Sequence, residues 1–244
     1  MQWRRVASGI MGVSIILLVT PSLLAKTPSE GKPPGQNPPA AEPETRRKLF
    51  DGRSLRGWSG DKARWTIGDG AISGRSDPSG AAALVSDDRF GSFRLTFSVR
   101  VGPGGEGSVC FWGRRPSEAR AWSCPGLAFT FPTPGGWDGR SGKSLTWKSV
   151  HSNPVKDGDA WIDVEILADM HTGRVRMAEN GIEVLDYVDP EPTRLGAGPL
   201  SFQTAASAGP PRQIQIKNVL VDTAPRTGVL LTVNLCGVQT PAEK

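Results

Sequence analysis

The chain of 244 residues carries a formal net charge of +5 and contains 30 glycines and 21 prolines. Its basic side chains are scattered and form no stripe, so nucleic acid is not expected among its partners. The glycine and proline content, and the lack of helical apolar spacing after residue 25, argue against a helical protein and favour a nearly all-β one.

The N-terminal segment, residues 1–25, combines a positive start at Arg4 and Arg5 with a mostly apolar run over residues 6–24. This pattern predicts a secretory signal that ends at Ala25, and an uncleaved membrane anchor is the alternative. We therefore expect an exported protein, in the periplasm, the cell envelope or the extracellular space. Membrane contact is expected only through such an anchor.

Residues 26–45 form a proline-rich stretch without a large apolar side chain. Such a segment cannot bury a core and is expected to be a disordered linker. The remaining chain is long enough for one sandwich domain, which we place at residues 46–224. Residues 225–244 are then a C-terminal extension, whose apolar segment 228–235 is either an added edge strand or a tail.

Short runs of alternating apolar and polar residues recur through the predicted domain, separated by turn residues. The clearest run is 93–101, where every second residue is apolar, which predicts one buried and one solvent-facing side. Residues 68–70, Gly-Asp-Gly, predict a hairpin turn. Other strands are expected at residues 65–67, 71–73, 83–86, 108–113, 127–131, 145–150, 200–203 and 212–222.

The stretch 161–189 predicts a meander of three antiparallel strands. Its first strand alternates, which places Glu165 on the solvent-facing side. Turns are expected at Thr172–Gly173 and Asn180–Gly181, the latter a strong hairpin signal because both residues tolerate a positive φ. In the last predicted strand, the continuous apolar run 219–221 indicates either burial on both faces or a bulge.

Several motifs, taken in order, resemble the 3-keto-disaccharide hydrolase family, also described as 3-keto-glucoside lyases. They are Leu49–Trp58, Asp69–Gly74, Phe93–Arg100, Gly198–Gln203 and Ile216–Val219. The resemblance spans about residues 48–222. It implies a concanavalin A-like jelly-roll β-sandwich of two antiparallel sheets, with a sugar held on the concave face of one sheet.

The sequence departs from the family pattern where the family carries polar groups. Ala128 stands at its acidic position, Thr130 at its amide position and Ala205 at its histidine, whereas Gln203 persists. A carboxylate and an imidazole are the groups best able to move protons near neutral pH, and alanine can do neither. The departures put family-type catalysis in doubt.

Three residues are candidates for acid–base work: Glu106, Asp138 and His151. The two acids fall in glycine-rich loops, where binding groups concentrate, but solvated turn residues are the alternative. His151 follows the strand predicted at 145–150, and a lone histidine is more often structural.

Five residues are candidates for substrate binding: Trp112, Arg114, Trp137, Lys148 and Gln203. Indole rings stack on sugar faces, although large aromatic side chains also dominate ordinary cores. Arg114 offers a planar fork to a hydroxyl or a carboxylate, or it simply faces solvent. Lys148 is expected on the exposed sheet face. No metal or cofactor motif is present in the sequence, so we expect neither.

Two functions follow from this reading. The first is an exported carbohydrate-active domain that resembles 3-keto-disaccharide hydrolases and acts on the glycosidic bond of keto-glycosides. The alternative is a non-catalytic carbohydrate-binding or adhesion module that has lost the acidic and histidine positions. In both cases the expected partner is a saccharide or glycoside.

The chain contains three cysteines, Cys110, Cys124 and Cys236. In an exported protein these cysteines can be oxidised to disulfides. A hairpin centred on Ser117 would put Cys110 directly opposite Cys124, which predicts a disulfide between them. Pro125–Gly126 could instead break the strand and shift the register. Cys236 is expected to be the unpaired thiol.

Overall fold

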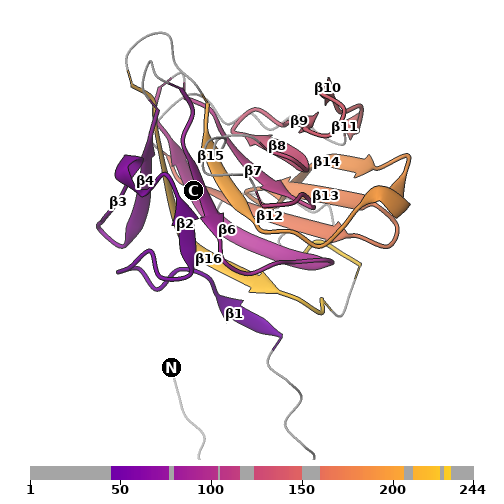
Figure 1. Ribbon diagram of the computed structural model, residues 1–244, viewed down its shortest axis with the longest axis horizontal. Coiled ribbons are helices and arrows are strands. Elements are labelled where there is room, and N and C mark those ends of the chain that lie inside the picture. The colour runs from indigo at the N-terminus through magenta and orange to yellow at the C-terminus, as the bar shows by residue number, and fades with distance from the viewer. Residues whose placement is uncertain are drawn as a thin grey trace, which may run out of the picture. The chain divides into compact units, whose positions relative to one another are not determined.

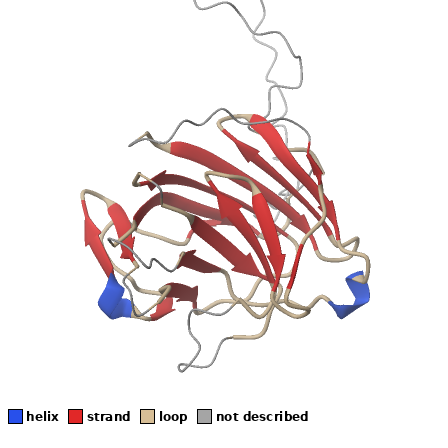
Figure 2. Cartoon of the chain, turned by 90° about the horizontal axis from the view of Figure 1, so that it is seen from above, coloured by secondary structure: helices blue, strands red, loops and turns tan. Residues whose placement is uncertain are grey.

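The computed structural model describes residues 45–76, 80–103, 105–115, 124–149, 160–205, 211–225 and 228–231. In these residues the chain forms two antiparallel β-sheets that pack face to face (Figures 1 and 2). The described residues include the 3-10 helices η1 (Lys62–Arg64) and η3 (Pro192–Arg194), which lie between strands. The predicted all-β sandwich of two antiparallel sheets is confirmed. The predicted signal segment lies outside the described residues.

The larger sheet has nine strands among the described residues. They are β1 (Arg46–Lys48), β3 (Trp65–Gly68), β4 (Ala71–Arg75), β6 (Phe93–Val101), β11 (Lys148–Ser149), β12 (Ile162–Asp169), β13 (Arg174–Glu179), β14 (Ile182–Val188) and β16 (Gln213–Asp222). Their order is β11-β14-β13-β12-β6-β16-β4-β3, and β1 pairs with the second half of β16. We call this the nine-stranded sheet.

The second sheet has seven strands in the described part of the chain. They are β2 (Trp58–Gly60), β5 (Ala83–Ser86), β7 (Gly107–Phe111), β8 (Leu127–Phe131), β9 (Gly135–Asp138), β10 (Lys143–Ser144) and β15 (Ser201–Thr204). Their order is β10-β9-β8-β7-β15-β5-β2. We call this the seven-stranded sheet.

Aromatic side chains from both sheets fill the space between them. Phe97 of β6 meets Phe202 of β15 at a ring-centroid distance of 5.1 Å, and Phe111 stacks on Phe129 at 5.4 Å. Burying one such side chain stabilises the fold by about 1.5–3 kcal/mol. The alternation seen in the sequence therefore places the predicted apolar set in the core.

The predicted meander is confirmed as β12, β13 and β14. Asn180 and Gly181 both have positive φ, 48° and 78°, as a two-residue hairpin turn requires. The apolar run at the end of β16 is explained by a bulge, because the register with β6 shifts between Lys217 and Leu220. Asn218 takes a φ of 57° at this bulge.

Two local predictions were wrong. A strand was expected at residues 145–150, but within the described part of this range, 145–149, only Lys148–Ser149 pairs, as a two-residue edge strand on β14 of the nine-stranded sheet. Residues 135–138 were expected in a loop and instead form β9, which pairs with β8. β9 shows no alternation in the sequence, because two of its four residues, Gly135 and Gly136, have no side chain to be apolar or polar.

The outer face of the nine-stranded sheet also differs from the prediction. Glu165 was expected to face solvent, but its side chain is fully buried. Arg94 on the neighbouring strand is buried with it, and the two form an ion pair. The cover comes from residues 228–231, whose Leu230 is 1% exposed and packs with Leu167 and Ala178. A segment remote in sequence therefore overrides the local pattern.

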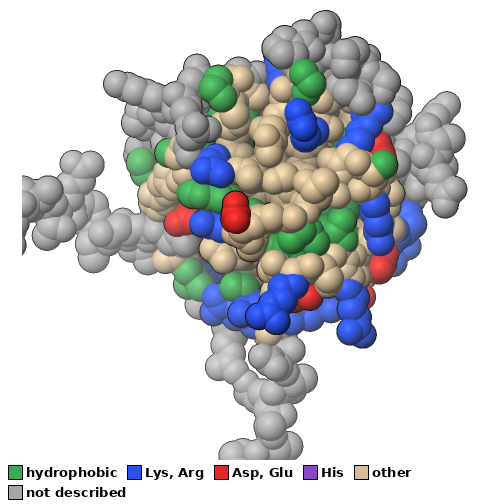
Figure 3. Space-filling view, turned by 90° about the vertical axis from the view of Figure 1, so that its left-hand side faces the viewer, with side chains coloured by type: hydrophobic (Ala, Val, Ile, Leu, Met, Phe, Trp, Pro, Cys, Tyr) green, Lys and Arg blue, Asp and Glu red, His purple; other side chains and the backbone are tan. Residues whose placement is uncertain are grey.

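Figure 3 shows the side of the sandwich that carries β3 and β4. Lys and Arg side chains lie around the border of this face, and uncharged surface fills most of its centre. Among the described residues, no helix is long and apolar enough to cross a membrane.

Candidate functional site

A groove of about 700 Å³ lies where the β9–β10 hairpin of one sheet approaches the end of β14 in the other. We call it the Asp138 groove. It is open to solvent, and most of its lining residues are polar or charged. Its lining residues are Asp138, Arg140, Ser141, Lys143, Ser144, Leu145, Thr146, Tyr187, Val188, Asp189, Pro190, Glu191 and Arg194.

The turn after β9 fixes the first wall of the groove. The Asp138 Oδ1 atom accepts hydrogen bonds from the backbone N of Arg140 at 2.9 Å and from its Nε at 2.8 Å. The Ser141 hydroxyl donates to Oδ2 at 2.9 Å. An aspartate that binds the backbone two residues ahead is a standard turn former, so the turn sequence itself orients the carboxylate.

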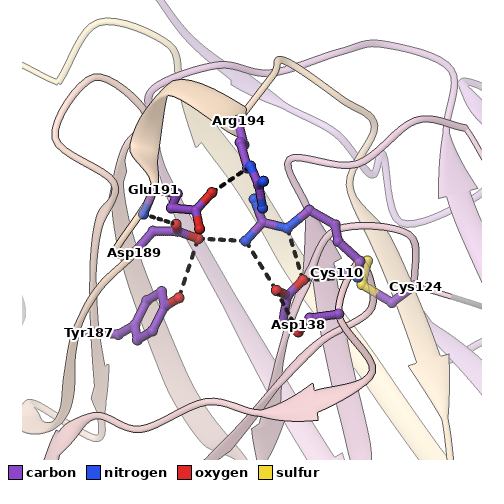
Figure 4. Close-up of polar contacts among 9 residues, drawn as sticks. Cys110, Cys124, Asp138, Tyr187, Asp189, Glu191 and Arg194 are labelled. Carbon is purple, nitrogen blue, oxygen red and sulfur yellow. Dashed lines mark hydrogen bonds and ion pairs between the residues drawn. A yellow bond between two sulfur atoms is a disulfide. The ribbon is translucent and has the colours of Figure 1, made fainter.

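Arg140 connects this wall to the opposite one. Its Nη2 atom donates to Asp189 Oδ2 at 2.6 Å, and the Asp189 side chain is only 1% exposed. The same oxygen accepts a bond from the Tyr187 hydroxyl at 3.3 Å, and Asp189 Oδ1 accepts one from the backbone N of Glu191 at 2.8 Å. Figure 4 shows these acidic and phenolic groups converging from two strands.

Burial and hydrogen bonds shift the pKa values of three groups in this network. Partial burial opposes the charge on Asp138, but hydrogen bonds from Arg140 and Ser141 outweigh it and lower the Asp138 pKa below its ordinary value. The two carboxylates raise the pKa of Arg140 against the effect of burial. Burial, and the Asp189 charge, raise the pKa of Tyr187, so its hydroxyl stays a donor.

The lowered pKa of Asp138 predicts an acid-sensitive contribution to stability. The ordinary aspartate pKa is about 3.9. Because the folded value is lower, the stabilisation is fully present above that pH and is lost as pH falls through the folded pKa. Urea unfolding between neutral pH and about pH 2 should therefore show a smaller acid-induced loss for Asp138→Asn than for the parent protein. Equal losses in both proteins would contradict the prediction.

A disulfide between Cys110 and Cys124 lies beside the network (Figure 4), with the two Cα atoms 5.7 Å apart. The register used to predict it was wrong, since Cys110 pairs with Ala128 and Cys124 precedes β8. The bond therefore crosses from β7 to the loop before β8. That loop supports the groove, because the Gly139 backbone N donates to Gly126 O at 2.8 Å.

The structure places two candidate residues close together on the seven-stranded sheet. Gln203 on β15 pairs with Ser108 on β7, and Glu106 immediately precedes β7. The backbone N of Ala205 donates to Glu106 O at 3.0 Å, so the position of the family histidine adjoins Glu106. Glu106 is exposed and Gln203 is 8% exposed.

The other candidates lie apart from this pair. Trp112 is a core residue, 2% exposed, with Nε1 donating to Gly91 O at 2.6 Å. Alternation along β7 would point it outward, but its φ of 58° reverses the side chain. Arg114 is exposed after β7, and Lys148 is exposed on the other sheet. His151 lies outside the described residues.

Trp137 is 45% exposed and belongs to the same hairpin as the Asp138 groove. It pairs with Ala128 and therefore faces the outer side of the seven-stranded sheet, opposite in direction to Asp138. Sequence reasoning missed Arg140, Tyr187, Asp189, Glu191 and Arg194. The signals that could have found them are the Asp-Gly-Arg-Ser turn at 138–141 and the Asp-Pro-Glu-Pro run at 189–192.

Residues 45–222 match the family model of the 3-keto-alpha-glucoside-1,2-lyase-like domain. The chain belongs to this family. The match covers nearly all of the described sandwich, so the predicted membership is confirmed and the family is one of carbohydrate-active domains. No curated protein matches the sequence. Among the described residues there is no cluster of side chains that could hold a metal ion.

Solved structures share the fold at low sequence identity. A candidate glycosyl hydrolase from Parabacteroides distasonis ATCC 8503 is 17% identical, with 73% of this chain and 93% of that chain covered and a TM-score of 0.52. The carbohydrate-binding module CBM66 from Bacillus subtilis is 14% identical, with 68% and 95% covered and a TM-score of 0.52. A protein of unknown function with a galectin-like fold, also from Bacillus subtilis, is 16% identical, with 73% and 94% covered and a TM-score of 0.54. The predicted jelly-roll architecture is confirmed.

Proposed function

We propose that this domain binds an uncharged saccharide in the Asp138 groove. Three acidic side chains (Asp138, Asp189, Glu191) and three basic ones (Arg140, Lys143, Arg194) line the groove, so its charges balance. A volume of about 700 Å³ suits a small ligand, since such sites typically measure roughly 300–1,000 Å³. A neutral, hydroxyl-rich molecule fits a site of this size and charge.

The observation that carries the proposal is the bridge from Asp138 through Arg140 to Asp189. A saccharide hydroxyl both donates and accepts, so its site needs fixed donors and fixed acceptors. The bridge holds carboxylate oxygens and guanidinium N–H groups rigidly, before any ligand arrives. Such preorganisation lowers the cost of ordering the site on binding.

Trp137 extends the proposed site beyond the groove. Its ring lies 4.0 Å from the position that a Cβ on Gly142 would occupy, so the indole lies against the turn between β9 and β10. A flat, half-exposed aromatic face can stack on the C–H face of a sugar. A second sugar unit that passed over the hairpin would meet this ring.

Calorimetric titration of the purified full-length protein with trehalose and with 3-keto-glucosides tests the proposal. We expect Arg140→Gln to weaken binding at least tenfold, because each charge-assisted hydrogen bond contributes about 1.5–3 kcal/mol. Arg174→Gln is the matched control. Arg174 also makes two hydrogen bonds to an aspartate, Asp186, but it lies on β13 and does not line the Asp138 groove. Equal affinity of both variants would reject the groove as the binding site.

Cleavage of keto-glycosides is a second candidate function, favoured by family membership and by the position of Glu106 beside Gln203 and Ala205. Glu106 would act as the base and Gln203 would hold a hydroxyl or the keto oxygen. The test is product formation from 3-keto-glucosides. Loss of product in Glu106→Gln, with product still formed by Asp138→Asn, would support this candidate. No product, with another family member active in parallel, would leave the domain as a binding module.

Export is part of the proposal. The positive start and apolar run of residues 1–25 support it. N-terminal sequencing of protein recovered outside the cytoplasm should begin at about residue 26 if the segment is cleaved as a signal.

A further inference from the structure

Residues Gly228–Leu231, which we call the C-terminal segment, lie on the outer face of the nine-stranded sheet without pairing as a strand. Leu230 is the only one of them that is buried; Val229 is 36% exposed and Leu231 is 66% exposed. The match to the family model ends at residue 222, so this segment lies outside the matched residues.

The sheet presents a shaped surface to the segment. In register, Arg94 of β6, Leu167 of β12 and Arg176 of β13 form one cross-strand row. The next row places Glu165 opposite Ala178. The Leu230 side chain packs against Leu167 and Ala178, in a buried cluster separate from the main core. We call this surface the segment seat.

Three hydrogen bonds with charged side chains hold the backbone of the segment. Arg94 Nη2 donates to Val229 O at 2.8 Å, and Arg176 Nη1 donates to Gly228 O at 3.1 Å. The backbone N of Leu231 donates to Glu165 Oε1 at 2.9 Å. The seat thus contacts the backbone of the segment through charged groups and one side chain through an apolar contact. Many peptide-binding surfaces combine affinity and specificity in this way.

We propose that the segment seat is a peptide-recognition surface whose ligand is the chain's own C-terminal segment, and that the segment binds it as a separable peptide with Leu230 as its specificity residue. The contacts that support this are all local to the seat. None of them requires the covalent connection to β16, which acts by raising the effective concentration of the segment. The proposal is independent of the saccharide site.

The test uses the full-length protein with a protease site in place of residues 226–227, cleaved after folding. The C-terminal fragment should stay bound during gel filtration. An excess of a synthetic peptide covering residues 226–233 should displace it at a concentration at least tenfold lower than the same peptide with Leu230→Asp. Equal displacement by the two peptides, or loss of the fragment immediately after cleavage, would overturn the proposal.

A second variant guards against a general loss of structure. Full-length Leu230→Asp, with the same protease site, should keep the β-sheet circular dichroism spectrum and should release its fragment on cleavage at least ten times faster than the parent. Leu231→Asp is the matched control, because Leu231 is mostly exposed. Retention of the Leu230→Asp fragment as long as the control fragment would show that the seat does not recognise Leu230.

Discussion

Glu165→Gln is expected to lower the free energy of unfolding by about 3–5 kcal/mol, the usual cost of removing one partner from a buried ion pair. The Glu165 side chain is fully buried and the Arg94 side chain is 7% exposed. The substitution removes the carboxylate charge that pairs with the Arg94 guanidinium. It also weakens the acceptor for the Leu231 backbone N. Urea unfolding measured by tryptophan fluorescence gives the difference directly.

Two further variants separate burial from simple charge loss. Asp186→Asn breaks the ion pair with Arg174, in which the Asp186 side chain is 20% exposed and the Arg174 side chain 50%. It should lower the free energy of unfolding by at most about 1 kcal/mol. The double change Arg94→Met/Glu165→Leu removes both buried charges and should recover most of the loss. A cost for Glu165→Gln no larger than that for Asp186→Asn would refute the account.

Gly139→Ala is the second change with a large expected effect. A Cβ at Gly139 would lie 1.6 Å from the backbone oxygen of Cys124. The disulfide to Cys110 restrains this backbone, so the turn that carries Asp138 and Arg140 must shift instead. Overpacking of this kind costs about 1–3 kcal/mol and sometimes more. We expect saccharide affinity to fall at least tenfold as well.

Gly196→Ala is the control for Gly139→Ala, because a Cβ at Gly196 meets nothing within 4 Å. It should leave both stability and affinity within about 0.5 kcal/mol of the parent, as surface substitutions usually do. Calorimetry and urea unfolding on the same preparations compare the two changes. Unaltered saccharide affinity in Gly139→Ala would show that the turn does not position the groove.

Local periodicity was enough to predict most strands, because a two-residue period states which side chains are apolar on one face. The alternation of residues 93–101 became β6 without an error in its bounds. The same reasoning failed for Glu165, whose burial depends on Leu230, 65 positions away along the sequence. Periodicity predicts which side chains share one face of a strand, but it does not predict which other segment covers that face.

The candidate site was harder to predict for a related reason. Asp138 was identified, but its partners Arg140 and Asp189 meet only because β9 and β14 end at the same edge of the sandwich. Trp112 was predicted to bind substrate, but a single positive φ turns its side chain into the core. A tryptophan rarely adopts such a φ, and the sequence gives no sign of it. The disulfide register failed because the hairpin was assumed to be symmetric about Ser117.

The pairing of β1 with β16 has a mechanical consequence. Arg46 lies opposite Asp222 and Lys48 opposite Leu220, so residue 45 and residue 223 leave the sheet at the same point. A force that pulls these two ends apart would act on one β1–β16 residue pair at a time and not on all three together. Three residue pairs would open in sequence before the load reached Leu49, whose N–H bonds to Val219 O, and Phe50 in the core. A pull on residue 45 is therefore absorbed first by β1, before the load reaches the core.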